Sequence, residues 1–206
     1  MLKNLKFLVC PICKCDFIKK TRTKLYCKEC SSHYEIRDSI PILLPPNLEE
    51  FKVLEAEYHD KEAHHYGEIN MIDSYHVTHY IDKYLGVVNT LGKNSILLEV
   101  GSGDGNDANL ITNSGINVIQ SDISFEMVKL AKNNKVNSNI LYTVSDAENI
   151  PCKDNSLDAI MIVATLHHLP SPKNFFKEAR RALKPGGLLI IGFEPNSWPY
   201  FIFYPL

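Results

Sequence analysis

From Ser95 onward, short apolar runs alternate with segments of helical periodicity. The apolar runs are rich in Ile, Leu and Val, and they lie at 96–100, 117–120, 139–144, 159–163 and 188–192. Helix-like segments such as FEMVKLAKNN and PKNFFKEARRALK separate several of them. Strands that alternate with helices predict a parallel sheet built from βαβ units. Because the apolar runs are continuous rather than alternating, we expect helices to cover both faces of this sheet.

The chain before Ser95 has a different texture and predicts two further parts. Five of the six cysteines lie within residues 10–30, ahead of the proline-containing segment ILLPPN. An acidic, helix-favouring stretch, LEEFKVLEAEYHDKEAHHYGE, follows. We therefore expect a small cysteine-containing domain over 1–46, a helical connector over 47–94 whose helices would cover a ligand site, and the α/β domain over 95–206.

Composition is that of an ordinary globular protein. Hydrophobic residues make up 45% and charged residues 22% of the 206-residue chain, which argues against collagen-like or wholly disordered structure. The longest apolar stretches, such as AIMIVATL, have about eight residues and are far too short to span a membrane. The first residues show no signal-peptide pattern. The expectation is a cytoplasmic protein without a transmembrane segment.

Charge is divided unevenly along the chain. Residues 1–48 carry nine Lys and Arg against four Asp and Glu, a net charge of +5; the rest, with 13 basic and 20 acidic residues, carries −7. A basic module on an acidic body could approach a polyanion such as RNA with one end. A solvated Lys-rich hairpin explains the same residues equally well.

The cysteine spacing predicts a zinc site. Two C-x2-C pairs, Cys10 with Cys13 and Cys27 with Cys30, can close a tetrahedron of thiolates around one ion. Such an ion would stabilise a module whose core is too small to fold alone. A disulfide framework is the competing interpretation, which a reducing compartment disfavours. Four thiolates leave no open coordination position, so the zinc is expected to be structural, and Cys15 is left as a spare thiol.

The residues around these cysteine pairs narrow the choice of fold for the N-terminal part. FLVCPIC, LYCKEC and YEIRDSIPILLP resemble the small zinc-ribbon proteins related to the activating subunit of tRNA and translation-factor methyltransferases. The resemblance covers about 8–46, with Ser39 where that family usually has glycine. It implies a zinc ribbon, a fold used to recognise RNA or protein or to brace a neighbouring domain.

A glycine-rich turn follows the first apolar run of the α/β part. Gly101, Gly103 and Gly105 come directly after SILLEV, so the backbone there can turn sharply and approach a ligand beside a helix N-terminus. Asp122 ends the next run about twenty residues on, where a carboxylate can accept both hydroxyls of a ribose. The G-x-G-x-G spacing differs from the dinucleotide fingerprint, which weighs against NAD, and the chain has no P-loop motif.

These motifs together resemble class I S-adenosylmethionine-dependent methyltransferases of type 11, over about 97–195. ILLEVGSGDG, IQSDIS, VSDAENIPCKDNSLDAIMIVATLHHL and EARRALKPGGLLIIGFEPN resemble successive family motifs. The resemblance implies a Rossmann-like fold, S-adenosylmethionine as cofactor, Asp122 on the ribose and Asp146 on the adenine amino group. The full set of cofactor-binding residues that it implies is Glu99, Gly101, Gly103, Gly105, Asp122, Ile123, Asp146, Ala147 and Val163.

Two further residues are candidates for the site. His168, just past the fourth apolar run, is the acid/base candidate, against the alternative that the LHHL pair only packs and is solvated. Tyr66 is predicted to close over the cofactor from the connector.

The acceptor and the C-terminal edge are left open by the sequence. The basic ribbon favours RNA, the acidic catalytic half favours a small molecule, and a non-catalytic cofactor-binding scaffold that docks a partner is the alternative function.

Related domains usually continue with another helix and two more strands, so LLIIGF is expected at a sheet edge. The chain is then a fragment, or residues 198–206, a second copy or a partner chain cover that edge.

Overall fold

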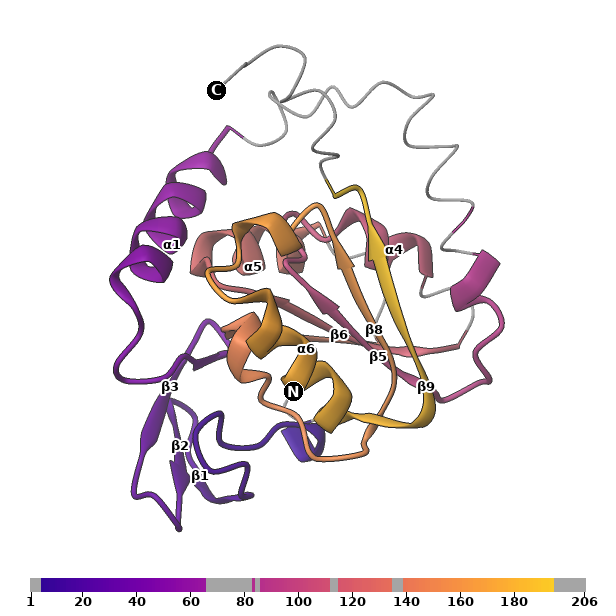
Figure 1. Cartoon of the computed structure of the whole chain (residues 1–206). Helices are drawn as coiled ribbons and strands as arrows, with labels where there is room; N and C mark the ends of the chain where they lie inside the picture. The colour runs from indigo at the N-terminus through magenta and orange to yellow at the C-terminus, as the bar shows by residue number, and fades with distance from the viewer. Residues whose placement is uncertain (1–4, 66–82, 84–85, 112–114, 135–138, 195–206) are drawn as a thin grey trace.

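The central sheet contains five parallel strands. In the computed structural model, which describes residues 5–65, 83, 86–111, 115–134 and 139–194 (Figure 1), they are β5 (Ile96–Val100), β6 (Asn117–Asp122), β7 (Ile140–Ser145), β8 (Leu157–Val163) and β9 (Leu183–Gly192). Their spatial order is β7-β6-β5-β8-β9, and each neighbouring pair is parallel. The parallel part therefore begins at its central strand β5, adds β6 and β7 on one side, and returns to add β8 and β9 on the other side, as in Rossmann-like folds. The predicted α/β fold with a parallel sheet is confirmed.

Helices cover both faces of this sheet, as the continuous apolar strands predict. The helix α6 (Pro172–Ala182) packs its buried Phe175 into the cluster that contains Leu98 and Ile160. On the opposite face, α4 (Asn106–Ile111) and α5 (Phe125–Asn133) pack into the cluster that contains Leu97 and Met161. Successive residues of one strand thus enter two different cores.

The N-terminal residues form an antiparallel meander that continues the same sheet. Its strands are β1 (Phe17–Lys20), β2 (Lys24–Cys27), β3 (His33–Arg37) and β4 (Ile40–Leu43), preceded by the 3-10 turn Leu5–Phe7. β4 also pairs in parallel with β7, Ile42 opposite Val144 and Leu43 opposite Ser145. The described strands therefore form one sheet of nine, a connection that the sequence pattern does not predict.

The conformation of the turn between β3 and β4 explains why the zinc-ribbon family usually has glycine where this chain has Ser39. Asp38 and Ser39 both have positive φ values, 49° and 62°. Two consecutive residues with positive φ make the tight turn that matches the twist of a hairpin, and glycine adopts this conformation at the lowest cost. Ser39 adopts the same backbone, so the turn is kept.

At the other end, β9 is the edge of the sheet among the residues that the structure describes. Ile191 and Phe193 there are 44% and 38% exposed. The segment 198–206, which the sequence offers as a cover for this edge, lies outside the described residues. None of the described helices is long and apolar enough to cross a membrane.

Candidate functional site

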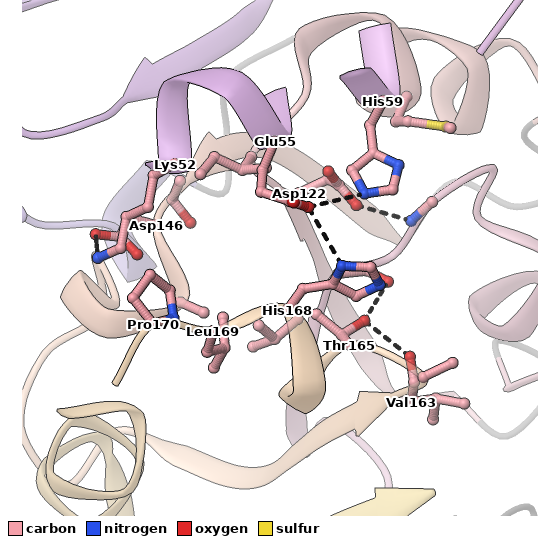
Figure 2. A pocket seen from close by; sticks show the side chains of 18 residues that line it. Lys52, Glu55, His59, Asp122, Asp146, Val163, Thr165, His168, Leu169 and Pro170 are labelled. Atoms are coloured by element: carbon pink, nitrogen blue, oxygen red, sulfur yellow. Dashed lines mark hydrogen bonds and ion pairs between the residues drawn. The ribbon is translucent and has the colours of Figure 1, made fainter. Parts of the chain in front are cut away.

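A cleft opens at the carboxyl ends of the parallel strands, where the strand order reverses. It has an empty volume of about 840 Å³, open to solvent. Such a reversal leaves a crevice between neighbouring loops and is the usual ligand site of open α/β sheets. The cleft is lined by the ends of β5, β6, β7 and β8 and by α1 (Glu50–Glu62), which lies across it (Figure 2).

Most of the predicted cofactor residues meet in this cleft. Those that line it are Gly101, Gly103, Asp122, Ile123, Asp146, Ala147 and Val163, together with the acid/base candidate His168. Glu99, on β5, and Gly105, in the glycine-rich turn, are not among the lining residues, and Tyr66 lies outside the described residues. The sequence motifs thus predict the location of the cleft well, although they were drawn from segments far apart in the chain.

Asp122 ties the glycine-rich turn to the end of β6. Its Oδ2 accepts a hydrogen bond from the Gly103 backbone N at 3.0 Å, and its Oδ1 accepts one from the Ser124 N at 2.9 Å. The residue is only 9% exposed, and burial raises the pKa of its carboxyl. Each oxygen retains acceptor capacity, so Asp122 both shapes the turn and offers a carboxylate to a ligand.

Two positions of the turn require glycine, each for a different steric reason. Gly101 has φ +67°, and a Cβ there would lie 2.7 Å from Thr165 Cβ and closer still to other atoms of that side chain. Gly105 has φ +79°, and its Cβ would lie 2.7 Å from Ala131 Cβ on α5. Gly105 therefore lets α5 pack closely against the turn, whereas Gly101 faces the cleft directly.

We expect Gly101→Ala to lower the free energy of unfolding by about 2–4 kcal/mol, since overpacking and a positive φ both oppose the new side chain. Gly86→Ala is the matched control, because a Cβ at Gly86 meets nothing within 4 Å. Denaturant unfolding of both variants measures the difference. Equal stability of the two variants would show that Thr165 yields freely and that the turn is not tightly packed.

Glu99 is a buried carboxyl near the end of β5, next to the glycine-rich turn. It is 4% exposed and accepts a hydrogen bond from Gln120 Nε2 at 3.0 Å. Burial, followed by the negative charge of Asp107, raises the pKa of Glu99 well above its ordinary value. A cationic ligand group near the turn would relieve this repulsion, because it favours the charged form of the carboxyl.

The α1 helix supplies three lining residues that sequence reasoning missed: Lys52, Glu55 and His59. The sequence carries little signal for them, because the helix has no apolar stripe; the burial of Lys52, which is 4% exposed, is seen only in the structure. Polar residues at i, i+3 and i+7 on one face of such a helix can indicate a site rather than a solvated surface.

Lys52 forms a buried ion cluster at the adenine side predicted for the cleft. Its Nζ lies 2.9 Å from Asp146 Oδ2 and 3.2 Å from Glu148 Oε2. Burial lowers the pKa of Lys52, but hydrogen bonding to Asp146 and the two negative charges outweigh it, and the net pKa lies above the ordinary value. The cluster therefore fixes the start of α1 against the end of β7.

Asp146 is almost fully occupied by partners within the chain. Its Oδ2 accepts from Lys52 and from Asn149 Nδ2 at 2.7 Å, and its Oδ1 accepts from the Glu148 N at 2.9 Å. A carboxylate has about four acceptor positions. One position on Oδ1 remains for a ligand amino group.

His168 lies at the cleft mouth, opposite α1. Its Nδ1 is 3.2 Å from Glu55 Oε2, and its ring stands 5.6 Å from the ring of His59. Burial, and then the neighbouring His167, lower the pKa of His168. The neutral imidazole, which can accept a proton, is thereby favoured near neutral pH.

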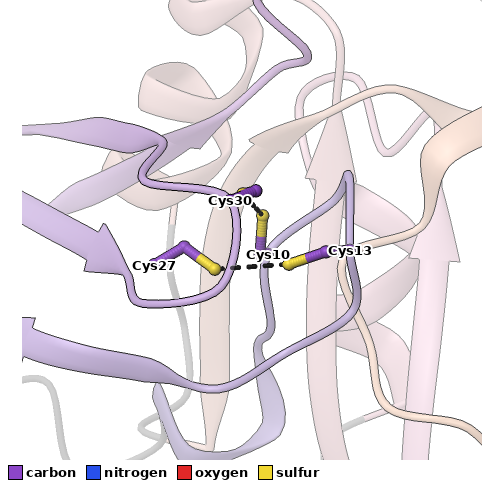
Figure 3. A group of neighbouring side chains, drawn as sticks. All are labelled: Cys10, Cys13, Cys27 and Cys30. Carbon is purple, nitrogen blue, oxygen red and sulfur yellow. Dashed lines mark hydrogen bonds between the residues drawn. The ribbon is translucent and has the colours of Figure 1, made fainter.

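The four predicted zinc ligands converge in one cluster in the N-terminal part of the chain (Figure 3). The Sγ atoms of Cys10 and Cys30 are 3.5 Å apart, and those of Cys13 and Cys27 are 3.3 Å apart. Four thiolates at about 2.3 Å from one zinc ion would be separated by about 3.8 Å, so the donor set fits a tetrahedral site. The Cys15 thiol lies outside this group and donates to the Cys13 carbonyl. All six cysteines lie among the described residues, and none of them forms a disulfide bond.

Comparison with known proteins identifies the kind of domain to which the cleft-forming part of the chain is similar. Residues 98–191 match the family model of a methyltransferase domain. A demethylmenaquinone methyltransferase of Tropheryma whipplei (strain Twist) is 36% identical over 110 residues, which cover 53% of this chain and 44% of that protein. The chain thus spans less than half the length of this curated relative. The family match and the relative support a methyltransferase domain over these residues, as the motifs predict.

Two solved structures resemble the fold of this chain over more residues than the family model matches. The phosphoethanolamine N-methyltransferase 2 of Haemonchus contortus in complex with S-adenosyl-L-methionine has a TM-score of 0.57 and 23% identity, covering 79% of this chain and 41% of that chain. A Haloferax volcanii complex that contains the Trm112 methyltransferase activator has a TM-score of 0.51 and 22% identity, covering 70% and 60%. At these identities the likeness shows the fold alone.

Proposed function

We propose that the protein transfers a methyl group from S-adenosylmethionine to an acceptor that enters the cleft. One observation carries this proposal: Asp122 is hydrogen-bonded to the backbone of the glycine-rich turn, at the point where the strand order reverses. S-adenosylmethionine, when bound, supplies a methyl group already activated on a positive sulfonium. The chain's part is then to hold and orient the reactants and to exclude water, since alignment supplies much of the rate.

The charges around the cleft suit a cationic donor. In this proposal Asp122 holds the ribose, Asp146 offers its remaining acceptor position to the adenine amino group, and Ala147 lies against the ring. We assign Glu99 to the ammonium group, whose positive charge would favour the ionised form of a carboxyl whose pKa burial otherwise raises. His168, kept neutral by its lowered pKa, is the group that would accept a proton from the acceptor. The remaining proposed cofactor contacts are Gly101, Gly103, Ile123 and Val163.

For the acceptor, we favour a small molecule over RNA. The matched relative is named a demethylmenaquinone methyltransferase, and the acidic side chains Glu55, Asp122 and Asp146 line the cleft, where they would repel a phosphate backbone. The basic charge on residues 1–48 supports RNA instead. Transfer of label to tRNA or rRNA rather than to a quinone precursor would decide for RNA.

The zinc ribbon is proposed as a structural brace that holds the methyltransferase domain from one side. Zinc bound by Cys10, Cys13, Cys27 and Cys30 would fix the meander whose last strand pairs with β7. The Haloferax volcanii complex contains a methyltransferase activator, and by analogy residues 1–46 would act as an activator carried on the same chain. A reducing cytoplasm, in which thiols stay available to zinc, fits this role.

Incubation of the full chain with methyl-labelled S-adenosylmethionine and fractionated cell extract tests the activity. We expect labelled product, and we expect Asp122→Ala to lower kcat/KM roughly 5- to 150-fold, the equivalent of losing about 1–3 kcal/mol of hydrogen bonding. Asp16→Ala, which removes an exposed carboxylate of the ribbon, should leave kcat/KM unchanged. Cofactor binding without turnover on any fraction would favour the non-catalytic scaffold.

A further inference from the structure

We propose that Glu55, His59 and His168 form a binding site for a divalent transition-metal ion at the mouth of the cleft. Glu55 and His59 stand one turn apart on α1, and His168 faces them from the 3-10 turn Leu166–His168 (Figure 2). One ligand atom from each residue lies within 4.8 Å of the other two. This site is separate from the cysteine cluster, and it contains no sulfur.

The distances in this trio fit a metal centre. Glu55 Oε2 is 3.5 Å from His59 Nε2 and 3.2 Å from His168 Nδ1. Ligands held at about 2.0–2.2 Å from one ion in tetrahedral geometry are separated by about 3.4 Å. The three atoms can therefore receive an ion with little rearrangement. Two imidazoles and one carboxylate suit Zn²⁺, Co²⁺ or Fe²⁺ better than Mg²⁺ or Ca²⁺.

His59 is already oriented as a metal-bound histidine would be. Its Nδ1 lies 2.9 Å from Glu62 Oε2, so a proton on Nδ1 is donated to that carboxylate and Nε2 is left as the free donor atom. Most metal-ligating histidines have such an outer partner, which fixes the tautomer and the ring orientation.

The α1 helix that carries the ligands is held at both of its ends. Lys52 is buried against Asp146 at one end. At the other end, Asp60 Oδ1 accepts hydrogen bonds from Ser124 Oγ at 2.5 Å and from the Glu126 N at 3.0 Å. Glu55 and His59 lie between these anchors and line the cleft. Little conformational entropy would therefore be lost when an ion binds.

Three protein ligands leave open positions on the metal, and those positions face the cleft. They suit a ligand with an oxygen donor, such as an acceptor with a phenol or enol group; that acceptor class rests on the proposed function, whereas metal binding does not. With a metal on Nδ1, His168 would position the ion and would not serve as the base.

Metal titration of the full chain, with its cysteine site already filled with zinc, tests this inference. We expect one further Co²⁺ or Zn²⁺ per chain by elemental analysis. The added Co²⁺ should give only weak d–d absorption, without the intense charge-transfer bands of a thiolate site. His59→Gln and His168→Gln should each remove this second ion, and Glu62→Gln should weaken it roughly 10- to 100-fold.

His64→Gln is the matched control, because His64 is an exposed imidazole just beyond the end of α1. It should bind the second ion as the wild type does. Thermal unfolding of each variant, with its ribbon ion counted, shows that any loss of the second ion is not a loss of folding. Absence of a second ion in the wild type, or its retention in His59→Gln and His168→Gln, would overturn the inference. S-adenosylmethionine binding, measured separately on the same samples, reports on the proposed function independently.

Discussion

Cys27→Ser is expected to prevent folding of the whole chain, and not of the N-terminal meander alone. Zinc binding contributes on the order of 10 kcal/mol to small zinc modules, which equals or exceeds the stability of an ordinary domain. Cys10 and Cys27 are buried in the same apolar cluster as Leu98, Ile160 and Phe175 of the methyltransferase domain. Loss of the ion would therefore open a core that both parts share.

Chelation of zinc from the wild-type protein should give the same result in a reversible form. We expect far-UV circular dichroism and tyrosine fluorescence, with Tyr34 buried in the meander and Tyr142 in the parallel sheet, to report one cooperative transition whose midpoint falls sharply as zinc is removed. Cys15→Ser is the matched control, since the Cys15 thiol stands outside the cluster of four, and it should retain both zinc and stability. A zinc-free protein whose methyltransferase domain still unfolds cooperatively at its original midpoint would contradict the shared core.

Lys52→Met is expected to lower the free energy of unfolding by about 3–5 kcal/mol, the usual cost of removing one member of a buried ion cluster. Asp146 and Glu148, whose side chains are each 2% exposed, would lose their shared cation. Glu148 also accepts hydrogen bonds from the Ser171 N at 2.8 Å and from Asn174 Nδ2 at 3.3 Å. The substitution would thus disturb the start of α6 as well as the start of α1.

Denaturant unfolding of Lys52→Met beside Lys61→Met measures this effect. Lys61 is an exposed residue of the same helix, and its substitution should change the stability by less than about 0.5 kcal/mol. Similar stabilities of the two variants would mean that water or other groups compensate the two buried carboxylates. In that case the ion cluster would not be what holds α1 over the cleft.

The parallel sheet and most of the cleft could be predicted because their signals are local. Each apolar run is a strand, and the residues that end β5, β6 and β7 reach one edge because parallel strands all end there. Gly101 and Asp122 could therefore be grouped without coordinates, whereas Asp146 is placed with them by the family resemblance. The steric role of Gly105 could not, since it depends on Ala131, which lies 26 residues further on.

The role of the N-terminal parts could not be predicted for a different reason. Strand pairing between β4 and β7 joins residues about one hundred positions apart, and nothing in IPIL indicates which strand it meets. The α1 helix lacks an apolar stripe, so its polar residues resemble a solvated surface until Lys52 is seen buried. Charge that is buried by tertiary contacts leaves little trace in the periodicity of a sequence.

Calorimetric titration of the full chain with S-adenosylmethionine, followed by a crystal structure of the complex, tests the central claim most directly. The account predicts one molecule per chain with a micromolar or tighter dissociation constant, its ribose on Asp122 and its adenine beside Ala147. No binding heat, together with a cleft closed by side chains in crystals soaked with the compound, would contradict it.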